Sequence, residues 1–259
     1  MKHHIDPKID CVFKAVLGTE ENRNLLIHFL NSILQEDLPT PIAGVDILNP
    51  YNEKESLNDK LSIVDVKARD QQGQLYQVEI QLLVYPALPS RMVYTWADLY
   101  SQQLQSGQDY ETLQPTYAIW LVAENVIAGD ERYAREYRFR DDKGVSLGRC
   151  LSSVASGSSV RRPVAKKRRV ARVPEDSTAF APAAAAWPAR SDDHGGIWLL
   201  ELNKFQVERI ETEQQRWLKF FKEGERLDDE ALPEWMNTDE MRQAMNTVRV
   251  FSEKERHYH

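Results

Sequence analysis

The sequence predicts an α/β fold with a mixed sheet, on the basis of its element order and two particular stretches. By apolar spacing, the chain runs helix, three strands, helix, strand. Residues 61–82 read as a β-hairpin around the turn sequence DQQG, which supplies antiparallel strands. Residues 116–123 (TYAIWLVA) form a continuous apolar run after a proline, as in a strand that is buried on both faces.

The individual elements follow from the period of the apolar residues. Helical spacing predicts helices at residues 9–16, 21–35, 90–107, 207–222, 229–236 and 239–251. Alternating or continuous apolar runs predict strands at residues 42–48, 61–69, 74–82, 116–123, 133–140 and 197–205. Ser90 is expected to cap the third of these helices, which Gly107 ends.

Composition is ordinary for a globular protein, with 42% hydrophobic and 28% charged residues among 259. This length allows one elaborated domain, or one domain with an appendage. No run approaches the roughly 18 apolar residues of a membrane span, and the N-terminus lacks the apolar segment of a signal peptide, so we expect a cytosolic protein. Cys11 and Cys150 have no metal-binding spacing and are expected to be free thiols. The oligomeric state stays open, a homodimer included.

The positive charge is concentrated in one segment. The net charge is −7, yet residues 149–173 hold eight of the 33 basic residues and no acidic one, which leaves 25 basic against 40 acidic residues elsewhere. Contact of the folded part with DNA must therefore use a local patch. The segment includes PVAKKRRVAR, which resembles a nuclear-import signal, although non-specific DNA attraction or an unselected solvated tract is the simpler interpretation.

Residues 149–196 combine this basic run with an Ala/Pro tract and lack any hydrophobic period. We expect a disordered insertion or a long surface loop. The predicted organisation is a core at 1–148, the insertion at 149–196, and a returning strand with C-terminal helices at 197–259.

The hairpin at residues 61–82 carries the polar residues of greatest interest. Because strands place alternate side chains on opposite faces, Asp65 shares a face with Lys67, and Glu79 shares one with Gln81. Each strand thus offers one apolar face and one face that carboxylates interrupt.

The turn decides whether the two acidic residues meet. If it is a three-residue loop with Gly73 in the left-handed conformation, Asp70 pairs with Gln74. Counting back, Asp65 lies directly opposite Glu79, with Cβ atoms roughly 4.5–5.5 Å apart. A two-residue turn would shift the register by one and separate the two acids.

Two opposed carboxylates should repel each other unless one is protonated or a cation lies between them. A divalent metal is the economical cation, and oxygen ligands favour Mg²⁺, Mn²⁺ or Ca²⁺. The alternative is that Asp65, Glu79 and Gln81 are exposed polar positions on a half-solvated hairpin, because this spacing alone is a weak pattern.

Further features surround the hairpin. They are D-x-x-F-K at 10–14, NRNLLIHFLN at 22–31, SIVDVKARDQQGQLYQVEIQ at 62–81, and a segment with Arg91, Tyr94, Tyr100, Gln103, Gly107 and Tyr110. With these the chain resembles the PD-(D/E)XK nuclease superfamily, and more closely its recombination-promoting nuclease branch of transposases. The resemblance covers about residues 6–140 and resumes at 199–205 (LLELNKF). The family pattern passes directly from the edge strand to the LLELNKF strand and has no counterpart of residues 149–196.

The resemblance implies a restriction-endonuclease-like core of order αβββαβ with a C-terminal helical region. It also implies a metal-dependent DNA endonuclease that promotes DNA recombination or mobile-element transposition. Asp65 and Glu79 would hold Mg²⁺, or Mn²⁺, which polarises the scissile phosphate and activates a water. The superfamily usually has a lysine where this chain has Gln81. An amide can orient water but cannot neutralise charge, and glutamine is typical of this branch.

Other candidates come from the same resemblance or from position. Lys67 shares the face of Asp65 and is a hypothetical source of the missing positive charge. Asp10 is a further metal ligand by resemblance, or else a helix cap or solvated acid. Lys14, Arg91 and Gln103 are candidate DNA contacts, although a solvated helix lysine is the simpler interpretation of Lys14.

The sequence leaves two other functions open. One is a catalytically inactive DNA-binding or interaction module that keeps the fold, which a cleavage assay separates from a nuclease. The other is a hydrolase for a small phosphorylated ligand, but the sequence holds none of the usual phosphate-binding or hydrolase motifs.

Overall fold

The computed structural model describes residues 5–50, 64–144, 146–147, 194–227 and 231–258. The chain divides into one unit of residues 1–139 and 194–259 and a second unit of residues 140–193. The predicted disorder at 149–196 and the basic tract at 149–173 lie almost entirely outside the described residues, as do Cys150 and residues 61–63. Among the described helices, none has the length and apolar character to cross a membrane.

The first unit contains a six-stranded mixed sheet and five α-helices among the described residues. The helices are α1 (Asp10–Leu17), α2 (Arg23–Leu34), α3 (Leu88–Ser101), α5 (Glu213–Glu223) and α6 (Asp239–Tyr258). The strands are β1 (Val45–Leu48), β2 (Val66–Asp70), β3 (Leu75–Gln81), β4 (Thr116–Val122), β5 (Ala134–Tyr137) and β6 (Gly195–Glu201). Short 3₁₀ helices lie at Glu20–Asn22, Tyr110–Thr112, Leu202–Lys204, Gly224–Arg226 and Glu234–Met236.

The strands lie in the order β1-β2-β3-β4-β6-β5. The pairs β1–β2, β2–β3 and β5–β6 are antiparallel, whereas β3–β4 and β4–β6 are parallel. The predicted mixed sheet is confirmed. In chain order the elements around the hairpin run helix, three strands, α3, β4, which is the arrangement of a restriction-endonuclease-like core.

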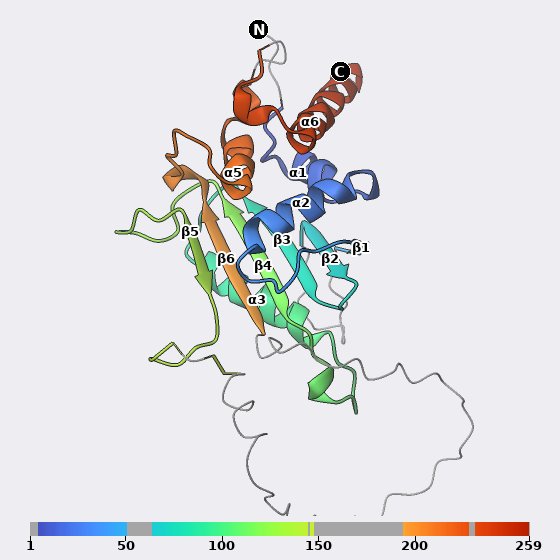
Figure 1. Cartoon of the computed structure of the whole chain (residues 1–259), viewed down its shortest axis with the longest axis vertical. Helices are drawn as coiled ribbons and strands as arrows, with labels where there is room; N and C mark the ends of the chain where they lie inside the picture. The colour runs from blue at the N-terminus through green and yellow to red at the C-terminus, as the bar shows by residue number, and fades with distance from the viewer. Residues whose placement is uncertain (1–4, 51–63, 145, 148–193, 228–230, 259) are drawn as a thin grey trace, which may run out of the picture. The chain divides into compact units, whose positions relative to one another are not determined.

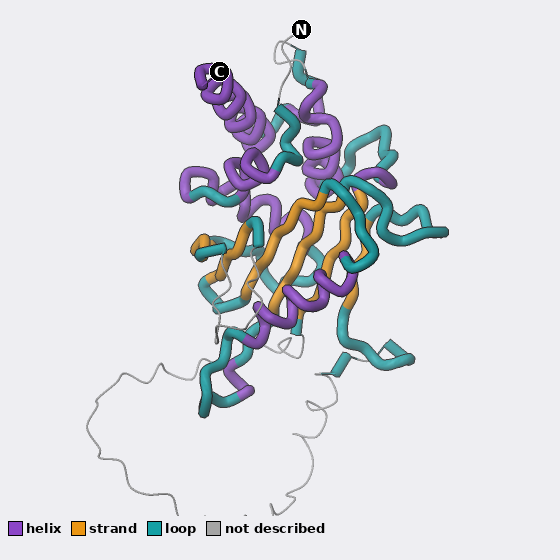
Figure 2. Tube along the Cα trace, turned by 180° about the vertical axis from the view of Figure 1, so that it is seen from behind, coloured by secondary structure: helices purple, strands orange, loops and turns teal. Residues whose placement is uncertain are grey.

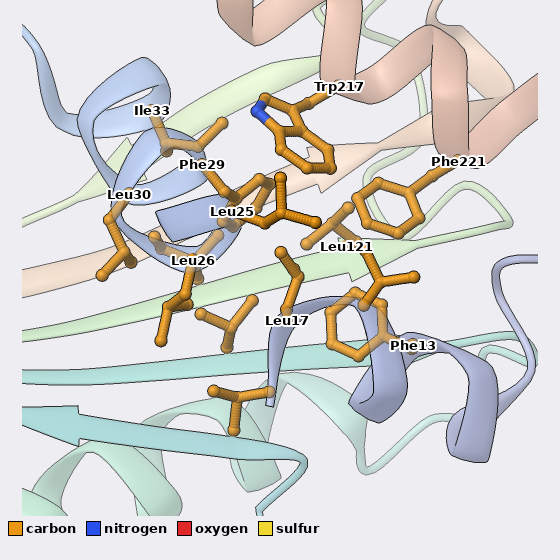
Figure 3. Close-up of a cluster of buried hydrophobic side chains, with 14 of the residues drawn as sticks. Phe13, Leu17, Leu25, Leu26, Phe29, Leu30, Ile33, Leu121, Trp217 and Phe221 are labelled. Carbon is orange, nitrogen blue, oxygen red and sulfur yellow. The ribbon is translucent and has the colours of Figure 1, made fainter. Parts of the chain in front are cut away.

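Two hydrophobic cores cover the two faces of the sheet. α1, α2 and α5 lie on one face, where aromatic rings such as Phe13, Phe29 and Trp217 fill the core, and α6 packs against α1 and α2 (Figures 1 and 3). α3 crosses the other face and packs Met92 and Trp96 against apolar residues of β4 and β6 (Figure 2). The central strands are therefore buried on both sides, and a polar side chain on β3 must point into one of these two layers.

The hairpin turn has the predicted conformation. Gly73 has φ +86°, and its N–H donates to Asp70 O at 3.1 Å. Asp70 N donates to Gln74 O at 3.1 Å, and the Asp70 carboxylate accepts from the backbone N–H groups of Gln72 and Gln74. The register of a three-residue loop is confirmed, because Lys67 pairs with Gln77 as predicted.

Several predicted boundaries differ from the structure. α3 begins at Leu88 rather than at a Ser90 cap, because Pro89 fits the first turn. β6 begins at Gly195, two residues before the predicted start. The helix predicted at 207–222 begins only after Thr212, which forms a capping box with Gln215. Of the helix predicted at 229–236, the described residues show the 3₁₀ turn Glu234–Met236.

A buried ionic network surrounds Glu201, the last residue of β6. Glu201 is 1% exposed and accepts hydrogen bonds from the backbone N–H groups of Val126 and Ile127 at 2.7 and 3.0 Å. Its other carboxylate oxygen binds Lys204 Nζ at 3.0 Å and the guanidinium of Arg135. Because Glu201 binds the backbone of Val126 and Ile127, the network fixes the loop after β4 to the sheet.

Candidate active site at the open end of the hairpin

The predicted acidic residues lie where β2 begins and β3 ends. Asp65 immediately precedes β2, whereas the sequence placed it near the middle of a longer strand. Continuing the observed register by one residue from Val66–Val78 puts Asp65 opposite Glu79, as predicted. α1 reaches this end of the sheet through Lys14, and α3 reaches it through Arg91.

Side chains replace main-chain pairing at this point. The ladder would next join Val64 and Ile80, but Ile80 N donates to Asp65 Oδ2 at 2.9 Å. In turn, Asp65 N donates to Glu79 Oε1 at 3.3 Å. The strand pair therefore ends where the Asp65 carboxylate binds the Ile80 N–H and the Glu79 carboxylate binds the Asp65 N–H, which explains why β2 is shorter than predicted.

The two carboxylates bind cations from different helices. Lys14 Nζ lies 3.3 Å from Asp65 Oδ1 and 2.7 Å from Asp10 Oδ1, so it bridges both. Arg91 Nη2 donates to Glu79 Oε2 at 3.3 Å. The predicted need for positive charge at the opposed acids is met in this structure by these two side chains.

Exposure increases from the interior to the surface across the three acids. The Glu79, Asp65 and Asp10 side chains are 2%, 14% and 63% exposed. The alternative of exposed polar positions on a half-solvated hairpin is wrong for Glu79, because β3 is covered by α3 on the face that carries it. Buried carboxylates whose pKa is perturbed cluster at functional sites, which makes Glu79 a candidate site residue.

Burial also shifts the acid strengths. Burial raises the pKa of Glu79 to about 8, and the neighbouring Asp65 adds to the rise while Arg91 opposes it. Burial raises the pKa of Asp65 to about 6, together with a hydrogen bond to Asp10, while the Ile80 N–H and Lys14 oppose the rise. Partial burial opposes ionisation of Asp10, but hydrogen bonds with Lys14 and Asp65 outweigh it and lower its pKa.

Gln81 lies beside Glu79 on the same strand face. Its Oε1 accepts from Arg91 Nη1 at 3.4 Å, and its Nε2 donates to Leu83 O at 2.9 Å. Arg91 Nη1 also donates to Tyr85 Oη at 3.5 Å. Gln81 and Arg91 thus join the end of β3 to the loop that follows it.

Beneath these residues lies a buried polar layer. Gln77 Nε2 donates to Glu79 Oε1 and to Thr95 Oγ1, both at 3.2 Å. The guanidinium carbon of Arg91 lies 5.4 Å from the ring centroid of Trp120, the residue paired with Glu79 on β4. Within the described residues, Gln77 Oε1 and Trp120 Nε1 are buried without a hydrogen-bond partner.

Two predicted residues have other contacts. Lys67 Nζ donates to Gln102 Oε1 at 3.4 Å, at the C-terminal end of α3, and its role in catalysis stays a prediction. Gln103 donates to Gln114 O and Thr116 Oγ1, both at 3.0 Å, and so fastens the loop before β4. Ten residues of helix separate Arg91 from the end of α3, about 15 Å, so Gln103 lies away from the carboxylates.

Some site contacts were missed by sequence reasoning. The Lys14 bridge had a signal, because Asp10 and Lys14 are four residues apart on one helix and face each other. The buried Gln77 had a signal as well, as the third polar residue on the face of Glu79. The contact of Arg91 with Glu79 had none, because it depends on how α3 crosses the sheet.

The donor chemistry fits a hard divalent cation. Mg²⁺ usually binds through one or two carboxylates and completes its shell with water and substrate phosphate, which matches the pair Asp65 and Glu79. Asp10 is connected to this pair through Lys14 and a hydrogen bond to Asp65. The described residues contain no group of three or more His, Cys, Asp or Glu that could hold a metal ion.

Comparison with known protein families identifies a match. A family model described as PD-(D/E)XK nuclease family transposase matches residues 7–150. This range contains α1, the hairpin, α3 and all the acids and cations of the candidate site. No curated protein and no solved structure matches the chain.

Proposed function

The chain belongs to the PD-(D/E)XK nuclease family of transposases, whose model covers more than half of its residues, and from this premise we propose that it is a metal-dependent DNA endonuclease. One observation supports the proposal above the others. Asp65 and Glu79 lie opposite each other at the end of the hairpin, and both have raised pKa values. The exposed fraction of the side chain rises from Glu79 through Asp65 to Asp10.

Asp65 and Glu79 are the residues proposed to hold Mg²⁺, with Mn²⁺ as the closest substitute. When bound, the metal supplies polarisation of the scissile phosphate and a lower pKa for the attacking water. The Ile80 N–H orients the Asp65 carboxylate, and the Gln77 amide orients that of Glu79. Lys14, whose side chain is 36% exposed, can move from Asp65 to a DNA phosphate.

The proposed reaction is hydrolysis of a phosphodiester bond. A water oxygen bonds to phosphorus, one phosphorus–oxygen ester bond breaks, and the leaving oxygen becomes a hydroxyl. Strand breaks made in this way would promote recombination or the movement of a mobile element. The overall charge of the chain is negative, so DNA must be held by local cations such as Lys14 and Arg91.

The test is nicking of supercoiled plasmid by the full chain with Mg²⁺ or Mn²⁺. Asp65→Asn and Glu79→Gln keep the size of each side chain and remove its charge. Each is expected to lower the rate by at least about 100-fold. The matched control is Glu208→Gln, which changes an exposed glutamate outside the site and is expected to leave the rate unchanged.

Two outcomes would contradict the proposal. Nicking that survives both substitutions would show that other residues, or a contaminant, cut the DNA. DNA binding without any nicking by the wild-type chain would favour the alternative of a catalytically inactive DNA-binding module.

A further inference from the structure

We propose that Arg91 supplies the positive charge at the scissile phosphate and that Gln81 is the positioning residue that holds it there. This inference rests on the proposed nuclease function and assigns the cation of that site. The sequence alone leaves the source of this positive charge open and offers Lys67 as a hypothesis.

Arg91 is joined to the site by two acceptors on one strand face. Its Nη2 binds Glu79 Oε2 at 3.3 Å, and its Nη1 binds Gln81 Oε1 at 3.4 Å. Because these residues alternate along β3, the guanidinium lies along the same face that presents the buried carboxylate. An acceptor at both positions fixes the plane of the group as well as its distance.

Two aromatic residues hold the guanidinium from other sides. The ring of Trp120, which is fully buried, lies 5.4 Å from the guanidinium carbon, in the range of a cation–π contact. Tyr85 Oη accepts from Nη1 at 3.5 Å. Arg91 is therefore placed by the fold and needs little ordering when a ligand arrives.

The guanidinium still has donors for a phosphate. Of its five N–H groups, three are directed at Glu79, Gln81 and Tyr85. In the described part of the chain, the other two have no acceptor, and the side chain is 38% exposed. Two N–H groups on an always-charged plane match the oxygen pair of a phosphate.

The contacts of Gln81 explain why an amide suits this position. Its carbonyl oxygen accepts from Arg91 while its NH₂ group donates to Leu83 O, so both ends are engaged within the protein. A lysine here would place a second positive charge against the guanidinium, since lysine has no acceptor. Glutamine and an arginine on α3 together provide what a lysine alone would provide at position 81.

The decisive experiment moves the positive charge from position 91 to position 81. Arg91→Ala is expected to lower kcat for Mg²⁺-dependent nicking by about 100-fold. The double variant Gln81→Lys with Arg91→Ala is expected to recover at least a tenth of the wild-type rate, because lysine returns the charge to the same strand face. Gln81→Lys alone is expected to slow nicking through repulsion. Gln81→Met, which removes the acceptor, should lower kcat with KM unchanged.

A second measurement does not depend on cleavage. Fluorescence anisotropy measures binding of a labelled DNA duplex in EDTA. Arg91→Ala should bind more weakly, and the slope of its log affinity against log salt concentration should fall by about one, the equivalent of one phosphate contact. Arg249→Ala removes an exposed arginine from α6 and is the matched control. Melting temperatures of all variants establish that each is folded.

The outcomes separate this inference from the proposed function. If wild type never nicks, the nuclease function fails, and the EDTA binding data alone decide whether Arg91 contacts phosphate. If wild type nicks and Arg91→Ala nicks equally well, the inference is wrong. It is equally wrong if the double variant is no faster than Arg91→Ala, since Arg91 would then be a structural counterion of Glu79.

Discussion

The backbone N–H of Ile80 donates to the carboxylate of Asp65 at the position where the next main-chain pair of the hairpin would form. Strand pairing thus ends because a side chain takes the place of a backbone carbonyl. The same exchange leaves the carboxylate inside the protein, where burial raises its pKa. This site and the strands and buried network that surround it lead to four predictions.

Mg²⁺ should stabilise the folded chain through Asp65 and Glu79. At 100 times its Kd, a ligand adds about 2.7 kcal/mol, which raises Tm by about 5–10 °C in a domain of this size. A calorimetric or fluorescence melt with and without Mg²⁺ measures this. Glu79→Gln and Asp65→Asn should abolish the shift, and Glu208→Gln should retain it. An equal shift in all four proteins would mean that Mg²⁺ binds elsewhere.

Metal-free stability should fall as pH rises. The pKa of Asp65 and that of Glu79 are higher in the folded chain than in the unfolded one, about 6 and about 8 against ordinary values near 4. Their contribution to stability is complete below about pH 4 and is lost as pH rises through the folded values. Glu79→Gln removes the later part of this loss.

The melting temperature of Glu79→Gln in EDTA, minus that of wild type, should therefore become more positive between pH 6 and pH 9. Taking the difference removes the contribution of all other titrating groups. A difference that stays constant over this range would show that Glu79 is ionised in the folded chain throughout.

The Glu201 network should be essential for stability. Glu201→Gln leaves the Arg135 and Lys204 charges, 6% and 4% exposed, without their buried carboxylate. Removal of one partner from a buried ion pair costs about 3–5 kcal/mol. Urea denaturation measures this loss, with Glu208→Gln as the exposed control. A loss below about 1 kcal/mol would mean that water reaches the two cations.

Gly195 at the start of β6 should tolerate no side chain. Its φ is +81°, and an added Cβ would lie 2.1 Å from Thr116 O on the neighbouring strand. Gly129 also has positive φ, +72°, but its added Cβ would meet nothing within 4 Å. Gly129→Ala is expected to cost about 1 kcal/mol, and Gly195→Ala at least about 3 kcal/mol, by thermal or urea unfolding. Similar costs for both would indicate that the strands separate easily here.

Short-range sequence features predicted the hairpin and its register correctly. The sequence around Gly73 determines the loop, the loop determines the register, and the register places Asp65 opposite Glu79. The family match over residues 7–150 confirms the family that the same motifs suggested. These features depend on neighbours in the chain, so the sequence alone contains them.

Contacts between distant elements could not be predicted in this way. Arg91 was expected to face DNA, and its contact with Glu79 emerges only when α3 packs across β3. The early end of β2 was missed because alternation of side chains does not reveal that a carboxylate replaces a backbone acceptor.

The pairing of β5 with β6 has a consequence for how this gene can change. The two strands are antiparallel neighbours, with Tyr137 beside Ile197, so everything between them leaves and re-enters the sheet at adjacent points. The entropy of closing a loop grows slowly, by about 0.6 kcal/mol for each doubling of its length. Foreign sequence could therefore enter, lengthen or be lost at this junction across generations, while the hairpin and its acids, on the opposite half of the sheet, keep their geometry.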